Sequence, residues 1–206
     1  MKLKCINEIE SGALRKRYFS AALTAFLLFA HASIEAVTVI PTYPIPLRPE
    51  IIGQLKQVHA GKHTQWQLLV FGFTHCRDIC PASLSNLSML VNAATAEKIK
   101  LNGIFVTVDP DRDTNAILSR YTKAFGSDLA YLRFEGEALE RFKAAFGVET
   151  AFYTKNAGNI ENYQVDHSTT AFLIDSEGNI RVIFDALEDA AQMAQIFREN
   201  KALFGS

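Results

Sequence analysis

Short apolar runs and amphipathic stretches alternate along most of the chain. Leu68–Phe71 and Ile104–Val108 are mostly apolar, which is typical of strands buried in a parallel sheet. Ala82–Lys98 lies between them and repeats apolar residues every three to four positions, which predicts a helix. A strand, a helix and a second strand in this order predict a parallel pair joined by a crossover helix.

The same alternation continues to the end of the chain. The further predicted elements are a helix capped by Asp113 or Thr114 and ending near Phe125, a strand at Tyr131–Phe134, a helix at Glu137–Phe146, a surface loop or loose hairpin over 148–164, paired antiparallel strands at Thr169–Asp175 and Asn179–Asp185, and a helix from about Leu187. The whole pattern predicts an α/β domain over residues 51–206 with a thioredoxin-like fold, in which helices cover both faces of a mixed central sheet.

The N-terminal segment has the pattern of an export signal. Residues 1–17 carry five basic side chains, residues 18–30 carry no charge, and Ala30-His31-Ala32 has the small-x-small form of a cleavage site. We therefore expect residues 1–32 to be a signal peptide, with an uncleaved membrane anchor as the alternative. Two glutamates in the basic segment argue against a mitochondrial transit peptide. The expected location is the periplasm or the periplasmic face of the inner membrane.

A proline-rich segment follows. Residues 33–50 contain four of the six prolines, which predicts a linker or an extended arm. A short helix is predicted at Glu50–His63, and it carries His59 and His63 four positions apart. Gly61 lies between them and indicates a fraying helix end, which we favour over a paired-histidine metal site.

Charge and cysteine content restrict the class of function. Residues 1–32 hold five of the 21 Lys and Arg and two of the 22 Asp and Glu, so the rest of the chain has an excess of acidic side chains. This balance argues against a nucleic-acid binder. Removal of the segment would leave Cys76 and Cys80 as an even pair in an oxidising compartment. A pair that works reduced would need a periplasmic thiol reductant as a partner.

The candidate chemistry lies where the first buried strand meets the next helix. Cys76 and Cys80 are separated by three residues and are followed by Pro81. The positive end of the helix dipole and the neighbouring Arg77 are expected to favour the thiolate form. Two sulfurs about one helical turn apart can bind one metal ion with less backbone strain than a disulfide between them would need. A disulfide is still possible at this spacing. We expect the two cysteines to bind a metal ion between them and to be capable of oxidation to a disulfide. The alternative is that both are buried structural cysteines.

Three motifs together resemble the SCO/SenC family. They are FGFTHC-x-D-x-CP at 71–81, VDPDRDT at 108–114 and VDHS at 165–168. The resemblance implies a thioredoxin-like copper chaperone that helps to metallate the dinuclear copper centre of cytochrome c oxidase subunit II. It implies Cys76, Cys80 and His167 as the ligands of Cu(I) or Cu(II). The chain departs from the family at Arg77, where the family has a proline.

Two thiolates and one imidazole suit the soft ion Cu(I). His167 is expected in a loop just before a strand and beside the end of the first strand, with a structural role as the alternative. His75 is the rival ligand, but it adjoins Cys76 and its side chain is expected to point away from the pair. Asp78 and Asp166 are candidates for orienting the ligands, or alternatively for surface charge that faces a partner.

Asp109, Asp111 and Asp113 alternate along one segment. The glycine and the distal glutamate of a calcium loop are absent from it, so we expect helix capping and a surface turn.

Two other functions remain open on the sequence alone. One is a thiol–disulfide oxidoreductase that uses Cys76 and Cys80 to reduce the cysteines of its target. The other is a redox or copper sensor. The expected protein partner of the chaperone is cytochrome c oxidase subunit II or another cuproprotein.

Overall fold

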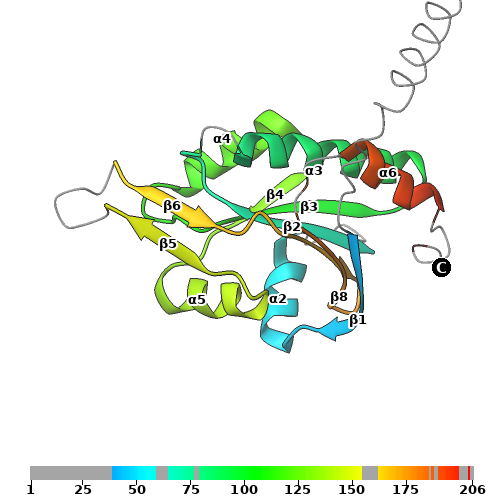
Figure 1. Ribbon diagram of the computed structural model, residues 1–206, viewed down its shortest axis with the longest axis horizontal. Helices are drawn as coiled ribbons and strands as arrows, with labels where there is room; N and C mark the ends of the chain where they lie inside the picture. The colour runs from blue at the N-terminus through cyan, green and yellow to red at the C-terminus, as the bar shows by residue number, and fades with distance from the viewer. Residues whose placement is uncertain are drawn as a thin grey trace, which may run out of the picture. The chain divides into compact units, whose positions relative to one another are not determined.

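The computed structural model describes residues 39–58, 65–76, 79–154, 162–185, 187, 190–199 and 204 of the 206-residue chain. All of them lie in the unit Val37–Ser206, the second of two units into which the chain divides. In chain order the elements are β1 (Val39–Pro46), α2 (Pro49–Val58), β2 (Trp66–Gly72), α3 (Ile79–Ala96), β3 (Leu101–Thr107), α4 (Asn115–Phe125), β4 (Leu129–Leu132), α5 (Gly136–Ala145), β5 (Thr150–Tyr153), β6 (Gln164–His167), β7 (Ala171–Asp175), β8 (Asn179–Phe184) and α6 (Ala190–Glu199) (Figure 1).

The main sheet is mixed, and β2 lies inside it. Its strand order is β1-β8-β7-β2-β3-β4, and β2 pairs parallel with β3 and antiparallel with β7. All seven residues of β2 are buried, which explains its continuous apolar run. The predicted thioredoxin-like α/β fold with a mixed central sheet is confirmed.

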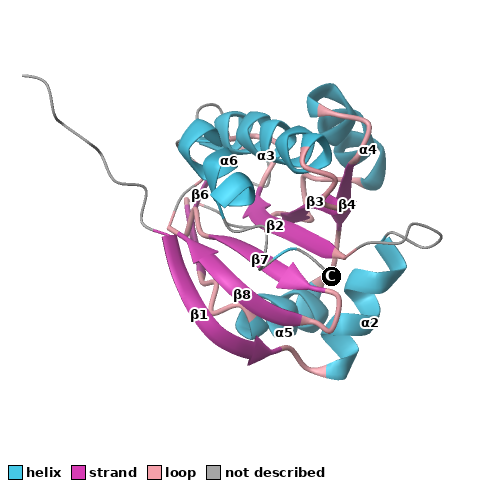
Figure 2. Cartoon of the chain, turned by 90° about the vertical axis from the view of Figure 1, so that its right-hand side faces the viewer, coloured by secondary structure: helices cyan, strands magenta, loops and turns pink. Residues whose placement is uncertain are grey.

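Helices cover both faces of this sheet. Alternate residues of β2 point to opposite faces, so Leu68 and Val70 join one core cluster while Leu69 and Phe71 join the other. The first cluster includes residues of α3, α4 and α6, and the second includes residues of α2 and α5. Figure 2 shows these two groups of helices on opposite sides of the sheet.

The start of the described chain differs from the expected linker. Residues 33–50 were predicted as a linker or extended arm, but residues 39–46 pair with β8 and form an edge strand of the sheet. Prolines remove backbone donors and are tolerated at a sheet edge, where one side of the strand needs no partner. The register shifts between Pro41 and Ile45, inside the proline-containing part of β1.

The helix after the cysteines begins three residues earlier than predicted. α3 starts at Ile79, so Cys80 and Pro81 lie in its first turn. A proline is acceptable there because the first N–H groups of a helix have no intrahelical partner. The predicted α4 is confirmed with its cap, since Thr114 accepts a hydrogen bond from the backbone N–H of Ile117 at 3.3 Å and Gly126 follows the last residue.

The region predicted as a loop or loose hairpin contains a separate two-stranded sheet. β5 and β6 pair antiparallel, with Thr150 opposite His167 and Phe152 opposite Val165. His167 is therefore the last residue of a strand and not part of a loop as predicted.

Several predictions fall on residues outside the described ranges. They include the signal peptide or anchor at 1–32, the histidines at 59 and 63, and Arg77 and Asp78. Within the described ranges, none of the helices combines the length and the apolar character needed to cross a bilayer.

Gly103 provides a test of the packing between β3 and its neighbours. An added Cβ would lie 2.4 Å from Leu129 Cδ2 and 3.1 Å from Leu87 Cγ. We expect Gly103→Ala to lower the free energy of unfolding by about 1–3 kcal/mol through overpacking, measured by urea denaturation. Gly53→Ala in α2 is the matched control, because nothing lies within 4 Å of its Cβ. A Gly103→Ala variant as stable as Gly53→Ala would contradict this packing.

Candidate metal centre

Two sulfur atoms meet at the N-terminus of α3. Cys76 follows the end of β2 and is half-buried, whereas Cys80 is only 3% exposed. The backbone N–H of Cys80 donates to Cys76 Sγ at 3.4 Å, so a sulfur accepts from a helix N–H that has no intrahelical partner. No disulfide joins the two cysteines. The residue spacing has thus put both thiols at one helix end, as predicted.

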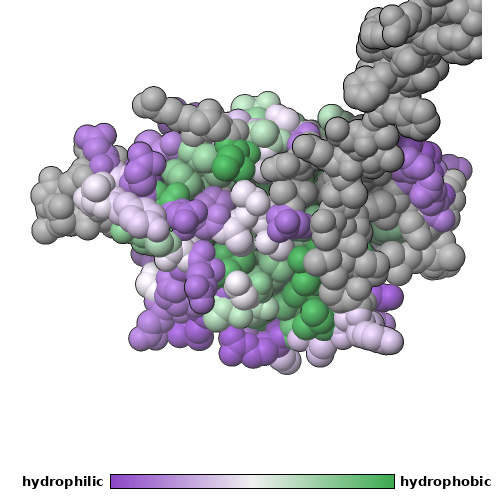
Figure 3. Space-filling model, viewed as in Figure 1, coloured by the Kyte–Doolittle hydropathy of each residue, from purple (hydrophilic) through white to green (hydrophobic). Residues whose placement is uncertain are grey.

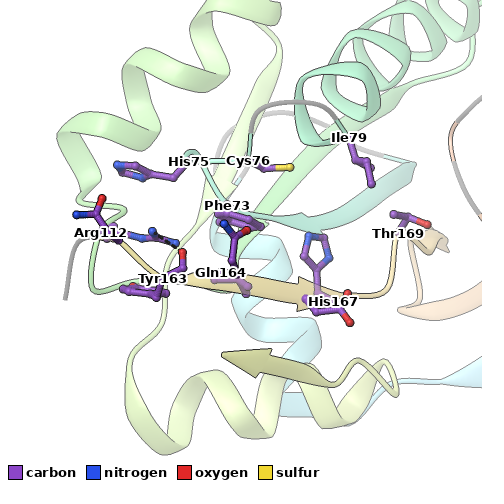
Figure 4. A pocket seen from close by; sticks show the side chains of 12 residues that line it. Phe73, His75, Cys76, Ile79, Arg112, Tyr163, Gln164, His167 and Thr169 are labelled. Atoms are coloured by element: carbon purple, nitrogen blue, oxygen red, sulfur yellow. Dashed lines mark hydrogen bonds between the residues drawn. The ribbon is translucent and has the colours of Figure 1, made fainter. Parts of the chain in front are cut away.

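His167 faces Cys80 from the end of β6. Its Nε2 lies 3.8 Å from Cys80 Sγ, although the two residues are 87 positions apart. Its Nδ1 lies 2.7 Å from the carbonyl oxygen of Ser168, so Nδ1 carries the proton and donates it. The lone pair of Nε2 is then directed at the sulfur. The ring packs edge-on against Phe73, with 5.8 Å between centroids. In Figure 4 it rises from β6 toward the segment with Cys76 and Ile79.

Burial moves both groups toward their neutral forms. Desolvation by burial raises the pKa of Cys80 to about 12, while a backbone hydrogen bond at Phe73 opposes this shift and Cys76 adds to it. Desolvation by burial lowers the pKa of His167, partly offset by the Ser168 hydrogen bond and the charge of Asp166. The expectation that the helix terminus favours the thiolate is therefore wrong for Cys80, because burial removes its charged form from water. A cation that binds here would displace the Cys80 proton.

A groove gives access to His167 and Cys76. It has a volume of about 650 Å³ and is lined by Cys76, Ile79 and His167 on one side of the site, with β6 along its length. Among the described residues no three His, Cys, Asp or Glu side chains already surround a common point as metal ligands would. Instead, Cys80 Sγ lies close to His167 Nε2, and Cys76 Sγ accepts a hydrogen bond from the backbone N–H of Cys80.

The other candidate ligands lie differently. The ring of His75 points away from the cysteine sulfur in Figure 4, as expected, and its Nδ1 lies 3.3 Å from Thr74 Oγ1. Asp166 is exposed on β6 and reaches His167 only through its charge. Asp78 is outside the described residues.

Two carboxylates of the predicted surface turn are in fact fully buried. Asp113 accepts hydrogen bonds from the backbone N–H of Thr74 at 3.0 Å and from the hydroxyls of Thr74 and Thr107 at 2.5 and 2.6 Å. It therefore ties the segment that leads to Cys76 to the end of β3. Asp109 pairs with Arg112, whose Nε lies 2.5 Å from its carboxylate. The prediction of a surface turn is wrong for these two residues.

The sequence contained one signal of this arrangement. Carboxylates that follow directly on a buried parallel strand lie at the sheet edge where sites form in α/β folds. The partners of Asp113 and Asp109 are distant in sequence, however, and burial of a carboxylate is favourable only where such donors converge.

Comparison with known proteins gives one consistent family. The SCO1/SenC family model matches residues 57–201. A Bos taurus protein named Protein SCO2 homolog, mitochondrial, is 34% identical over 144 residues, which cover 69% of this chain and 53% of that protein. Curated relatives of this kind are longer proteins, and the chain spans between about half and two thirds of their length.

Two solved structures that resemble this one contain copper. Yeast Sco1 with copper bound matches with a TM-score of 0.60 and 26% identity, over 68% of this chain and 78% of that chain. Arabidopsis thaliana ScoI with copper bound matches with a TM-score of 0.55 and 27% identity, over 66% of this chain and 85% of that chain.

The raised pKa of Cys80 predicts slow thiol chemistry in the reduced, metal-free protein. We expect the Cβ resonance of Cys80 to titrate near pH 12 in an NMR experiment, and the same resonance to titrate near 9 in denaturant. Because the unfolded chain loses this proton first, folding stability from this group is present below pH 9 and is lost as pH rises toward 12. A midpoint at or below 9 in the folded protein would contradict the account.

Proposed function

This chain belongs to the SCO1/SenC family, and we propose that it is a copper chaperone that binds one copper ion through Cys76, Cys80 and His167. The acceptor in this proposal is the dinuclear copper centre of cytochrome c oxidase subunit II. The observation that carries the proposal is the 3.8 Å approach of His167 Nε2 to Cys80 Sγ, with Nδ1 held by Ser168. The Ser168 hydrogen bond fixes the tautomer, burial lowers the pKa of the ring and favours its neutral form, and Nε2 then faces a sulfur.

The chemistry of the donors supports copper as the cargo. Two sulfurs and one imidazole nitrogen form a soft donor set that suits Cu(I), and the relatives from yeast and Arabidopsis thaliana have copper-bound structures. Binding of Cu(I) by two thiolates would release the thiol protons of both cysteines and leave two thiolates and one cation. Such a centre has a low net charge. This fits a site in which burial favours the neutral forms of Cys80 and His167 before the metal binds.

Release by ligand exchange fits the exposure of the donors. Cys76 is half-buried and lines the groove, so a thiol of an acceptor can reach the metal on that side. The face around the groove mixes polar and apolar side chains, as Figure 3 shows, which suits a transient protein partner. Ile79 is 55% exposed beside the cysteines and offers apolar contact area.

The proposal includes export and a reductant. The basic and apolar pattern of residues 1–32 supports a signal peptide or membrane anchor and hence a site in the periplasm or at its membrane face. Copper loading needs both cysteines as thiols, so an oxidising compartment would require a periplasmic thiol reductant as a second partner.

Thiol–disulfide exchange with the acceptor is the second candidate function. The hydrogen bond from Cys80 N to Cys76 Sγ keeps the two residues close enough to favour it. The raised pKa of Cys80 weakens it, because little thiolate is present at that sulfur near neutral pH. His167 also has no evident task in a dithiol reaction. A redox or copper sensor has no separate observation in its favour.

Substitution of the ligands tests the proposal. We expect Cys76→Ser/Cys80→Ser to abolish stoichiometric Cu(I) binding. We expect His167→Ala to lower the affinity for Cu(I) at least about tenfold, measured by competition with a chromophoric chelator. His75→Ala is the matched control and should bind as the parent does, because its ring points away from the sulfur.

A cellular assay separates the two functions. The chaperone function predicts that His167→Ala loses oxidase maturation together with copper affinity. Full maturation in that variant despite weak copper binding would favour the reductase. Undiminished copper binding in the double cysteine variant would refute the proposed site.

A further inference from the structure

A second cluster lies at the opposite end of β6 from His167. The hydroxyl of Tyr163 donates to the buried carboxylate of Asp109, and Arg112 Nε lies 2.5 Å from the same carboxylate. The guanidinium of Arg112 lies 3.6 Å from the centroid of the Tyr163 ring and donates to the Tyr163 carbonyl oxygen at 3.1 Å. Tyr163 is thus held by its ring, its hydroxyl and its backbone.

This cluster connects the strand of the histidine to the main sheet. β6 pairs with β5 in a sheet of its own, so the ladder of the six-stranded sheet does not fix its position. Tyr163 immediately precedes β6, and His167 ends it four residues later. Asp109 and Arg112 follow β3, which is paired with β2 and hence aligned with the strand that leads to the cysteines. Figure 4 shows Arg112 and Tyr163 together at one end of β6 and His167 at the other.

Two buried carboxylates of one segment therefore each hold one side of the site. Asp113 binds Thr74, in the segment that leads to Cys76. Asp109 binds Tyr163, at the start of the strand that leads to His167. A change at Tyr163 should disturb the imidazole and leave the sulfurs in place.

We propose that Tyr163, clamped by Asp109 and Arg112, is a positioning residue that sets the place of His167 against Cys80. The inference rests on the proposed role of His167 as a copper ligand and adds a residue outside the ligand set. Tyr163 directly precedes the four extended residues of β6, so a shift at Tyr163 displaces the strand that carries His167. The 3.8 Å approach of Nε2 to Sγ depends on that register.

The test is a double-mutant cycle of Tyr163→Phe with His167→Ala in the full chain. Tyr163→Phe removes only the hydroxyl, and Asp109 keeps Arg112 as its partner, so no buried charge is left unpaired. Tyr153→Phe is the matched control, because Tyr153 lies on β5 of the same hairpin and is 54% exposed. The readouts are Cu(I) affinity by chelator competition, the reduction potential of the cysteine pair, and the ¹⁵N resonances of His167 in the metal-free protein.

We expect Tyr163→Phe to lower the affinity for Cu(I) about tenfold, as loss of a group that orients a metal ligand does. It should have no further effect once His167 is alanine, and the cysteine reduction potential should not change. In the metal-free variant the ¹⁵N resonances of the His167 ring should shift, whereas Tyr153→Phe should match the parent in every readout.

Other results overturn the inference. An equal loss of affinity in the His167→Ala background would make Tyr163 a general structural residue, and unchanged affinity would remove its role altogether. If His167→Ala by itself leaves affinity unchanged, the proposed ligand set fails, and the inference with it. Should Tyr163→Phe not fold, Asp109→Asn carries the same cycle, since the amide oxygen still accepts from Arg112.

Discussion

The contact between His167 Nε2 and Cys80 Sγ is the interaction on which the site depends. It joins the first turn of α3, where Cys80 is buried, to the end of a strand 87 positions away. Burial raises the pKa of Cys80 and lowers that of His167, so both groups are uncharged when no metal is present. A thiolate–imidazolium pair would carry two buried charges in their place. A soft cation that replaces the proton of the Cys80 thiol balances the charge of the thiolate. The pair is therefore better suited to binding a metal than to redox chemistry.

The groups that hold this contact differ from those that make it. Asp109 and Asp113 lie four residues apart after β3, and each is fully buried with donors that converge on it. Hydrogen bonds to a buried carboxylate stabilise by about 1.5–3 kcal/mol each, and loss of the donors would leave an expensive unpaired charge. The segment after β3 thereby fixes the position of the chain around Cys76 relative to β6, which carries His167. Cys76 and His167 line a groove, where an incoming donor can reach them, whereas Cys80 is buried.

Much of this architecture could be predicted from the sequence, because local pattern and packing agree there. β2 and nearly all of β3 are buried and contain apolar runs, and α4 carries its cap in the sequence at Thr114. β1 and β6 could not be predicted in this way. The first is rich in prolines, and the second has only four residues. The protonation of Cys80 was mispredicted because it depends on tertiary packing, such as the close approach of Gly72, where a Cβ would lie 3.1 Å from Cys80 Sγ.

X-ray absorption at the copper edge of the Cu(I)-loaded full chain tests the central claim most directly. The account predicts two sulfur neighbours and one nitrogen with the multiple scattering of an imidazole. It also predicts that the imidazole signal disappears when residue 167 is alanine and persists when residue 75 is alanine. A copper site with sulfur neighbours alone, or an imidazole signal that follows residue 75, would contradict it.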